Sequence, residues 1–369
     1  MNHRTSMIDL AAFGWTAEQD QQFRQLENLD PLWIPGRVRG HNRLYYLLFT
    51  AQGDMTATLA GRLRHHAGGV QDLPVVGDFV AVRPAIGQET KAMVEALLPR
   101  NGAFSRADGD LTRASGAAAQ QIIAANIDTV FIVSSADADF SARRLERLLA
   151  AAWASNATPA LIITKIDLVE DPALLLAEVA AQTAGIAVFP VSNKTGAGID
   201  AIRAAIGPGQ TALLVGSSGV GKSSLTNQLL GLERQRVNAM NDQGRGQHTT
   251  TARDLFLLPT GGLLLDTPGV RVITPWFTDG LEATFTDIDD LALACKFHDC
   301  GHQSEPGCAV RAALEDGTIA AARYQGYLKL RRELSIVDRK GDKRAEAAQK
   351  RALRTRTKAK NRQQKITLD

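Results

Sequence analysis

Two stretches decide the fold, ALIITKIDLVED at residues 160–171 and GSSGVGKSS at residues 216–224. Each is joined to an apolar run, PALIIT (159–164) in the first case and TALLV (211–215) in the second. Continuous apolar runs are typical of strands that are buried on both faces of a parallel sheet. Ligands of such sheets bind at the carboxyl ends of the strands. We therefore predict an α/β domain in which both polar loops lie at one edge of the sheet.

The neighbouring sequence repeats this alternation of strands and helices. DTVFIV (128–133), IAVFPV (186–191) and GGLLLD, which ends at Asp266, are further apolar runs. Apolar residues recur at helical spacing from Ser141, a plausible N-cap, to residue 157. Helices are also expected near 171–184 and 198–206. Strands that alternate with helices predict a parallel sheet with helical crossovers.

The loop at 216–224 fits the pattern G-x-x-x-x-G-K-[ST] in full, between a predicted strand and an amphipathic helix that Gly231 ends. The glycines let backbone N–H groups turn toward phosphate oxygens at a helix N-terminus. Lys222 is expected to neutralise the β- and γ-phosphates, and Ser223 to coordinate Mg²⁺. The predicted phosphate-binding residues are Gly216, Ser217, Ser218, Gly219, Val220, Gly221, Lys222, Ser223 and Ser224.

Two further loops carry groups that a nucleoside triphosphate requires. DTPG (266–269) ends an apolar strand, so Asp266 can hold Mg²⁺ through a water and the Gly269 N–H can contact the γ-phosphate. GRGQHTTT (244–251) is punctuated by glycines and suits a switch that closes on Mg²⁺ and the γ-phosphate. Either of its last two threonines can be the Mg²⁺ ligand, and Thr250 is preferred.

Hydrolysis also requires a group that orients the attacking water. Val270 follows DTPG, and a valine cannot orient a water. His248, in the predicted switch, is the nearest residue with suitable chemistry, so we assign it as the candidate catalytic residue. The competing interpretation is an exposed loop histidine without a role in the reaction.

TKID (164–167) matches the guanine-reading motif of GTPases, in which an aspartate accepts hydrogen bonds from guanine N1 and N2. Lys165 can lay its stem over the base, and the loop VSNKTG (191–196) can offer a backbone N–H to guanine O6. Without the Asp167 assignment, a P-loop ATPase is the alternative. The predicted base-binding residues are Thr164, Lys165, Ile166, Asp167 and Ser192.

The order of these motifs is unusual, because TKID precedes the phosphate loop here and follows it in ordinary GTPases. All the motifs follow strands, so the site depends on the strand ends and not on their order along the chain. Domain termini often lie close together, and joining them while cutting elsewhere preserves the pocket. We therefore predict a circularly permuted GTPase domain.

Residues outside this domain have a different sequence pattern. Residues 1–30 resemble a polar lead-in with one possible helix, and 36–100 contain short strand-like runs broken by Gly, Asn and Pro. About five such strands suit a small closed barrel, for which an OB-fold is preferred and an SH3-like barrel is the alternative. The aromatic residues Tyr45, Tyr46, Phe49 and Phe79 offer stacking surface for RNA or, more simply, barrel core.

The cysteines indicate a metal site. The chain has only three, Cys295, Cys300 and Cys308, and an odd number argues against a disulfide framework. With a histidine from the same stretch they supply three thiolates and one imidazole, which suit a closed tetrahedral zinc site with a structural role. Reduced core cysteines without a metal are the alternative.

Composition and charge set the remaining expectations. With 369 residues, two or three domains are expected. The start of the chain lacks a secretory signal, and no apolar run approaches the ~20 residues that span a bilayer, so a cytoplasmic protein is expected. The net charge is +3, but residues 339–365 hold twelve Lys and Arg against two acids. Such a tail is either a solvated helix face or, as we prefer, a nucleic-acid contact.

The motif order TKID, VSNKTG, GSSGVGKSS, GRGQHTTT, DTPGV, followed by FHDCGHQSEPGC, resembles the ribosome small-subunit-dependent GTPases of the RsgA/YjeQ family. The resemblance runs from about residue 36 to 335. It implies an OB-fold barrel, a circularly permuted GTPase domain and an α-rich zinc domain. It also implies late maturation of the small ribosomal subunit, rRNA binding, and slow hydrolysis that the subunit stimulates. For the metal it assigns His302 as the ligand and leaves His298 aside.

On this basis we expect a monomer with five segments, and two departures from the family. The segments are 1–35 (extension), 36–100 (barrel), 101–278 (GTPase), 279–338 (zinc domain) and 339–369 (basic tail). The family usually has Asn where Thr164 stands, and Thr can perform only part of its work. Residues 107–118 are looser than the usual short basic linker. An RNA-binding GTP sensor with negligible turnover is the alternative function, because Val270 replaces a water-positioning glutamine.

Overall fold

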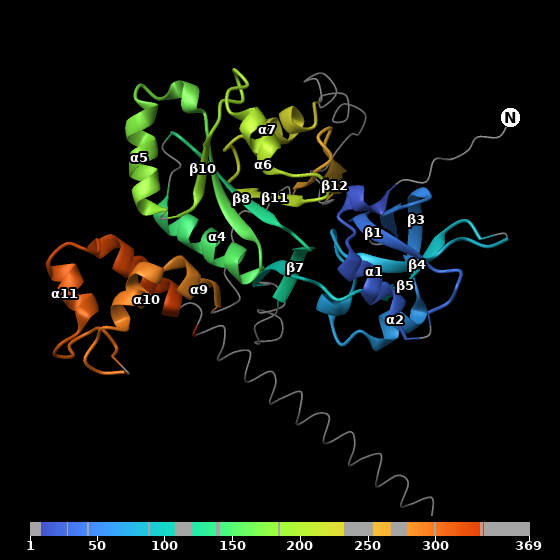
Figure 1. Ribbon diagram of the computed structural model, residues 1–369, viewed down its shortest axis with the longest axis horizontal. Helices are drawn as coiled ribbons and strands as arrows, with labels where there is room; N and C mark the ends of the chain where they lie inside the picture. Colours follow the sequence, from blue (N-terminus) through green and yellow to red (C-terminus); the bar gives the residue numbers. More distant parts are fainter. Residues whose placement is uncertain are drawn as a thin grey trace, which may run out of the picture. The chain divides into compact units, whose positions relative to one another are not determined.

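The computed structural model describes residues 9–27, 29–42, 44–87, 89–107, 120–137, 141–183, 185–231, 254–266, 279–298, 300–332 and 335 (Figure 1). The chain divides into two compact units, and each is described by itself. The first is built from residues 1–105 and 122–273, and the second from residues 106–121 and 274–369. In the described residues, no helix combines the length and the apolar character that crossing a membrane requires.

The N-terminal extension belongs to the folded core of the first unit. It forms a 3-10 helix (Leu10–Phe13) and α1 (Ala17–Arg24), which begins with a capping box between Thr16 and Gln19. The Phe13 ring is buried and stacks on Phe49 of the barrel, with 4.4 Å between the ring centroids. The extension therefore contains one more helix than its sequence indicated, and it is anchored by an aromatic contact.

Five strands form a closed barrel, β1 (Ile34–His41), β2 (Tyr46–Thr50), β3 (Gly53–Leu59), β4 (Phe79–Arg83) and β5 (Ala92–Leu97). Their order is β1-β2-β3-β5-β4, and β4 pairs back onto β1. The β3–β5 pair is parallel and the other pairs are antiparallel. This arrangement is that of an OB-fold, which confirms the preferred barrel over the SH3-like alternative.

A short helix and a 3-10 turn connect β3 to β4, namely α2 (Gly61–His66) and residues Val70–Asp72. The barrel interior is filled by small and branched side chains, among them Val38, Leu48 and Val80. Phe49 and Phe79 are buried, and only Tyr45 and Tyr46 retain partial exposure. Two of the four aromatic residues therefore belong to the core.

The α/β part of the first unit has six strands in the order β10-β9-β8-β11-β13-β12. The first five of these are mutually parallel, whereas β12 pairs antiparallel with β13 and touches the barrel through the single pair Gly40↔Asp254. The bounds are β8 (Thr129–Ser135), β9 (Thr158–Thr164), β10 (Ala187–Pro190), β11 (Thr211–Gly216), β12 (Asp254–Leu257) and β13 (Leu263–Asp266). The predicted parallel sheet is confirmed, and β12 is an additional strand.

Helices cover both faces of this sheet, namely α4 (Ala142–Ala154), α5 (Pro172–Gln182), α6 (Ile199–Ala205) and α7 (Lys222–Leu229) (Figure 1). Alternate residues of β8 point to opposite faces. Ile132 packs in the core that contains Leu148 of α4, and Phe131 packs in the core that contains Leu225 of α7. Burial on both faces explains why these strands are continuously apolar.

The strand that precedes the phosphate loop, β11, lies between β8 and β13 at the centre of the sheet. β8, β9 and β10 come earlier in the chain, and β12 and β13 come later. The chain therefore enters β11 from strands on one side of it and continues to strands on the other side. Such a reversal in strand order is where open α/β sheets place their ligand sites. The loops after β9, β10, β11 and β13 share one edge because these strands are parallel.

Arg37 joins three segments of the chain near the amino ends of the parallel strands, at the edge of the sheet opposite these loops. Its side chain is 2% exposed, and it donates hydrogen bonds to the carbonyls of Phe13 (2.7 Å), Gly77 (3.1 Å) and Asn126 (3.0 Å). Burial lowers the pKa of the guanidinium to about 10, against the opposing charges of Asp128 and Asp78. A buried guanidinium needs such acceptors. Arg37 of the barrel thereby joins the extension, through Phe13, to the turn that precedes β8, through Asn126.

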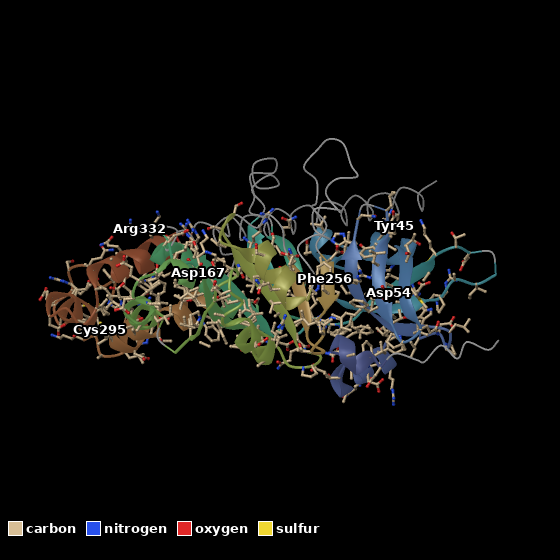
Figure 2. All side chains as sticks on the ribbon, turned by 90° about the horizontal axis from the view of Figure 1, so that it is seen from above. Tyr45, Asp54, Asp167, Phe256, Cys295 and Arg332 are labelled. Carbon is tan, nitrogen blue, oxygen red and sulfur yellow. The ribbon has the colours of Figure 1, made fainter. Side chains whose placement is uncertain are left out.

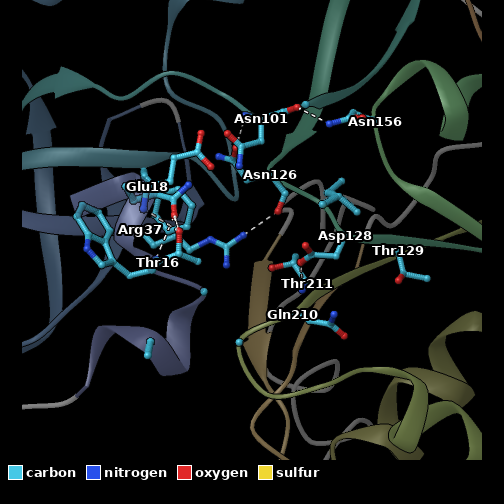
Figure 3. A pocket seen from close by; sticks show the side chains of 18 of the residues that line it. Thr16, Glu18, Arg37, Asn101, Asn126, Asp128, Thr129, Asn156, Gln210 and Thr211 are labelled. Atoms are coloured by element: carbon cyan, nitrogen blue, oxygen red, sulfur yellow. Dashed lines mark hydrogen bonds between the residues drawn. The ribbon is translucent and has the colours of Figure 1, made fainter. Parts of the chain in front are cut away.

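A cavity of about 700 Å³ adjoins Arg37 (Figure 3). Its lining includes Thr129, Thr158 and Thr211, the first residues of β8, β9 and β11. The cavity therefore lies at the amino ends of the strands, away from the loops where a nucleotide is expected.

Two short strands, β6 (Ala103–Ala107) and β7 (Gln120–Ala125), form a separate two-stranded sheet. The sequence between them, 108–119, lies outside the described residues, and with it all but the first residue of the predicted loose stretch 107–118. The predicted basic tail, 339–369, lies outside them as well.

The second unit is α-rich in its described part, as predicted. It contains α9 (Asp279–Thr284), α10 (Thr286–Ala292), α11 (Ala309–Glu315) and a further helix at 321–332. Aromatic residues hold it together, since the Phe285 and Tyr327 rings lie 5.4 Å apart, edge to face. Arg323 lies over the Phe285 ring at 4.7 Å and forms an ion pair of 2.7 Å with Asp287. The cysteine loop connects α10 to α11.

Candidate nucleotide site and metal centre

The phosphate loop has the conformation that its glycines were expected to allow. Gly216, Gly219 and Gly221 have φ angles of 154°, 85° and 94°, which residues with a side chain rarely adopt. A Cβ on Gly216 would lie 2.2 Å from the Val133 carbonyl oxygen, so the loop could not approach β8 with any other residue. Gly216 is the last residue of β11 and pairs with Val133 of β8, and the loop then leads to α7, which begins at Lys222.

Lys222 already lies within the loop that it is expected to serve. Its Nζ donates to the Gly216 carbonyl at 2.9 Å and to the Ser217 carbonyl. Ser223 and Ser224, in the first turn of α7, are exposed. A cation and exposed hydroxyls at the start of a helix form an arrangement that suits a bound polyphosphate.

The TKID loop contacts the phosphate loop directly. Thr164 is fully buried, and its Oγ1 donates to the Val220 carbonyl at 2.6 Å. Lys165 adopts a left-handed φ of 59° and begins the 3-10 turn Ile166–Leu168, in which Asp167 is exposed (labelled in Figure 2). The turn thus presents the Asp167 carboxylate to solvent beside the phosphate loop.

Asp137 belongs to this edge and was missed by the sequence analysis. Its Oδ2 lies 2.6 Å from Lys165 Nζ, and both side chains are partly exposed. The ion pair fixes the lysine whose stem is expected to cover the base. The sequence could have indicated Asp137 by its position, because it lies two residues after the carboxyl end of the parallel strand β8.

The VSNKTG loop follows β10 and is ordered by its own hydrogen bonds. Ser192 is 1% exposed, and its Oγ accepts from the backbone N–H groups of Lys194 (3.2 Å) and Thr195 (3.1 Å). The Asn193 Nδ2 donates to the Gly221 carbonyl at 3.0 Å. Ser192 therefore shapes the loop, and Asn193, which the sequence analysis did not single out, reaches the phosphate loop.

Asp266 ends β13 in register with Leu214, two residues before Gly216. The structure thus places the carboxylate that we expect to hold Mg²⁺ through a water next to the start of the phosphate loop. The predicted residues Gly269, His248 and Thr250 lie outside the described residues.

The metal centre is assembled from the four residues of the predicted set. The ligand atoms of Cys295, Cys300, His302 and Cys308 all lie within 4.8 Å of one another. His302 Nδ1 is 3.6 Å from Cys295 Sγ and 3.5 Å from Cys308 Sγ, and the two sulfurs are 3.8 Å apart. His298 is exposed and is not part of this group. Three thiols and one imidazole so close together fit a tetrahedral metal ion.

The loop around the metal centre is held by specific contacts. The Glu305 carboxylate accepts from the N–H groups of Gly301 (3.0 Å), Gln303 (2.8 Å) and Ser304 (2.9 Å). Its own backbone N–H, followed by these three, lowers its pKa to about 2. His302 has a left-handed φ of 57°, and its carbonyl accepts from Tyr324 Oη at 2.9 Å. Burial raises the pKa of the Cys300 thiol to about 11, so metal binding must displace a proton there.

Comparisons with known proteins agree with this geometry. The sequence profile of the RsgA GTPase family matches residues 98–276. "Small ribosomal subunit biogenesis GTPase RsgA 2" of Lactiplantibacillus plantarum is 44% identical over 303 residues, which cover 82% of this chain and 84% of the relative. "Small ribosomal subunit biogenesis GTPase RsgA" of Opitutus terrae is 42% identical over 346 residues, which cover 91% and 92%.

Solved structures show the same architecture. The crystal structure of YjeQ from Thermotoga maritima matches with a TM-score of 0.60 and 28% identity, covering 82% of this chain and 99% of that one. The structure of YloQ, described as a circularly permuted GTPase, matches with a TM-score of 0.57 and 25% identity, covering 84% and 98%. The permuted strand order, the phosphate loop and the relatives agree: this chain belongs to the RsgA family of circularly permuted GTPases.

Proposed function

We propose that this GTPase hydrolyses GTP to GDP and phosphate in the late maturation of the small ribosomal subunit, which stimulates the reaction. The observation that carries the proposal is the contact between the TKID loop and the phosphate loop. Thr164, in the guanine-reading motif, donates to Val220 of the phosphate loop at 2.6 Å. Base and phosphates would therefore be read by one connected surface. The names of the relatives, small ribosomal subunit biogenesis GTPases, support the biological setting.

The roles of the residues follow from their positions. Asp167 reads guanine N1 and N2, and Lys165 and Ile166 flank the base, with the Ser192 loop facing O6. Residues 216–224 hold the phosphates through backbone N–H groups, and Lys222 binds their charge. Ser223, Thr250 and Asp266 would hold Mg²⁺, which neutralises charge on the phosphate oxygens. The Gly269 N–H contacts the γ-phosphate, and His248 orients the attacking water.

The second unit supplies binding and not chemistry. Zn²⁺ is proposed for Cys295, Cys300, His302 and Cys308, because four protein ligands leave no open position for a substrate. The basic tail, 339–369, is proposed to contact rRNA phosphates, so affinity should fall with salt. We further propose a cytoplasmic monomer with segment boundaries at 35, 100, 278 and 338, and with the barrel as a second RNA-facing domain.

A test of stimulation separates an active enzyme from a GTP sensor. GTP turnover by the purified protein should rise at least about tenfold with small ribosomal subunits and stay unchanged with large subunits, because the subunit must complete the arrangement around the attacking water. The His248→Ala variant should bind GTP normally and lose the stimulated rate. Tight GTP binding without stimulation would favour the sensor, and unchanged turnover by His248→Ala would remove His248 from the reaction.

Asp167→Asn should remove most of the preference for GTP over ATP. The carboxylate accepts two hydrogen bonds from guanine, and charge-assisted bonds contribute about 1.5–3 kcal/mol each, so a loss of about 100-fold in the affinity ratio is expected. Competition of GDP and ADP against a fluorescent nucleotide measures this ratio. Glu170→Gln is the matched control, since it removes one exposed charge from the same segment. An unchanged ratio in Asp167→Asn would show that another residue reads the base.

A further inference from the structure

Asn193 occupies an unexpected position beside the phosphate loop. Its Nδ2 donates to the Gly221 carbonyl at 3.0 Å, and its own backbone carbonyl accepts from Gln228 Nε2 of α7. Its Oδ1 is buried and has no hydrogen-bond partner in the described part of the chain. A buried amide with one unmatched acceptor costs free energy.

Two side chains from neighbouring strands hold consecutive carbonyls of the phosphate loop. Thr164, at the end of β9, lies 2.6 Å from the Val220 carbonyl, and Asn193, after β10, reaches the Gly221 carbonyl. The two side chains converge on one point, because a Cβ on Gly221 would lie 2.6 Å from Asn193 Nδ2 and 3.7 Å from Thr164 Oγ1. The Gly221 carbonyl also accepts from the Leu225 N–H of α7 at 2.9 Å, so Asn193 adds a second donor to it and joins the start of the helix to the loop after β10.

The planar peptide unit converts this contact into a phosphate-binding geometry. The C=O of one residue and the N–H of the next point in opposite directions across a trans peptide. When the carbonyls of Val220 and Gly221 point toward Thr164 and Asn193, the N–H groups of Gly221 and Lys222 must point away from them. Those N–H groups lie at the N-terminus of α7, where a phosphate binds.

We propose that Asn193 is a positioning residue that shares with Thr164 the work of holding the phosphate loop in its nucleotide-binding conformation. The inference rests on the proposed GTP binding at this loop. It also accounts for Thr164, since the threonine hydroxyl reaches one carbonyl and the Asn193 amide supplies the second. An asparagine at 164 extends one bond further than threonine, into the space that Asn193 fills.

The proposal predicts compensation between the two positions. Asn193→Ala should weaken GDP affinity about tenfold, equivalent to about 1.4 kcal/mol. Thr164→Asn alone should also weaken it, because two amides compete for the space at Gly221. The double variant should recover to within about threefold of wild type. The ratio of GDP to ADP affinity should stay unchanged throughout, because Asp167 is untouched.

The measurement is titration of GDP carrying a fluorescent N-methylanthraniloyl group, with ADP in competition, and thermal melting without nucleotide. Gln52→Ala is the control, because it truncates an exposed amide in the barrel. The melting temperature of Asn193→Ala should stay within about 2 °C of wild type, as for loss of one hydrogen bond in a chain of this size. If that variant melts far lower, Asn193→Leu replaces it, because leucine has a similar size and carries neither a hydrogen-bond donor nor a charge.

The outcomes distinguish a failure of the role proposed for Asn193 from a failure of the proposed GTP site. A wild-type protein that does not bind GDP would overturn the proposed GTP site itself. Wild-type binding with unchanged affinity in Asn193→Ala would overturn the inference alone. A loss of affinity that Thr164→Asn does not restore would also overturn it, since the two positions would then act separately. Recovery in the double variant supports it.

Discussion

Replacing Lys222 by alanine is expected to abolish detectable GTP turnover and to weaken GTP binding at least about 100-fold. The ammonium lies inside the phosphate loop, 2.9 Å from the Gly216 carbonyl, so it needs only a small displacement to reach phosphate oxygens. Charge-assisted hydrogen bonds to phosphate are about twice as strong as neutral ones. Removing one such preorganised donor costs about 10²–10³ in rate in other enzymes.

The fold should survive this substitution. α7 is anchored by Leu225 and Leu229, which are fully buried, and the Lys222 ammonium donates to two carbonyls of its own loop. Lys91→Ala is the matched control, because Lys91 lies over the Tyr45 ring of the barrel, far from the loop in sequence and outside the α/β sheet. Nucleotide titration and phosphate release measure both variants. A Lys222→Ala protein that turns over GTP at the wild-type rate would refute the assignment of the phosphate loop.

Much of this site could be predicted because its strands are strongly apolar and its loops carry short motifs. β8, β9 and β11 are buried on both faces, so their sequences show no alternation that could be confused with a surface strand. A side chain on Gly216 would collide with Val133 of β8, and one on Gly221 would collide with Asn193. Local sequence and tertiary packing therefore demand the same residues.

The features that escaped prediction depend on contacts between distant segments. β12 has four residues, DLFL, and it pairs with β13 on one side and with β1 of the barrel through one residue pair on the other. Arg37 lies in a strand-like run where a charged residue is ordinarily exposed, yet three carbonyls from separate segments surround it. Asn193 is one residue among several polar ones in a loop, and only the approach of Gly221 gives it a role.

Ser141 shows a milder limit of sequence reasoning. It precedes α4 as expected, but its side chain makes no capping hydrogen bond to the helix. A serine is common at N-caps because its side chain can bond the first backbone N–H groups of the helix. Ser141 therefore marks the start of α4 correctly, although it does not make that bond.

Removing the metal is expected to unfold the cysteine loop and to leave nucleotide binding intact. The loop from Cys295 to Cys308 contains no helix or strand in its described residues, and it is held by local backbone bonds and by the contacts of Glu305 and Tyr324. Structural zinc sites in small peptides contribute about 10–16 kcal/mol of binding free energy, which is folding free energy. The phosphate loop and TKID lie in the other compact unit, which has its own core.

Cys308→Ser isolates metal ligation from helix capping. Cys308 is the N-cap of α11, and its Sγ accepts from the Arg311 N–H at 3.4 Å, a bond that a serine hydroxyl can replace. The variant should therefore keep the helix start and lose the metal. Metal analysis should give about one zinc per wild-type chain and none in Cys308→Ser, with faster proteolysis of the second unit. His298→Ala, which alters an exposed histidine outside the cluster, should keep its metal. Full metal content in Cys308→Ser, or loss of metal in His298→Ala, would mean that a different set of residues holds the ion.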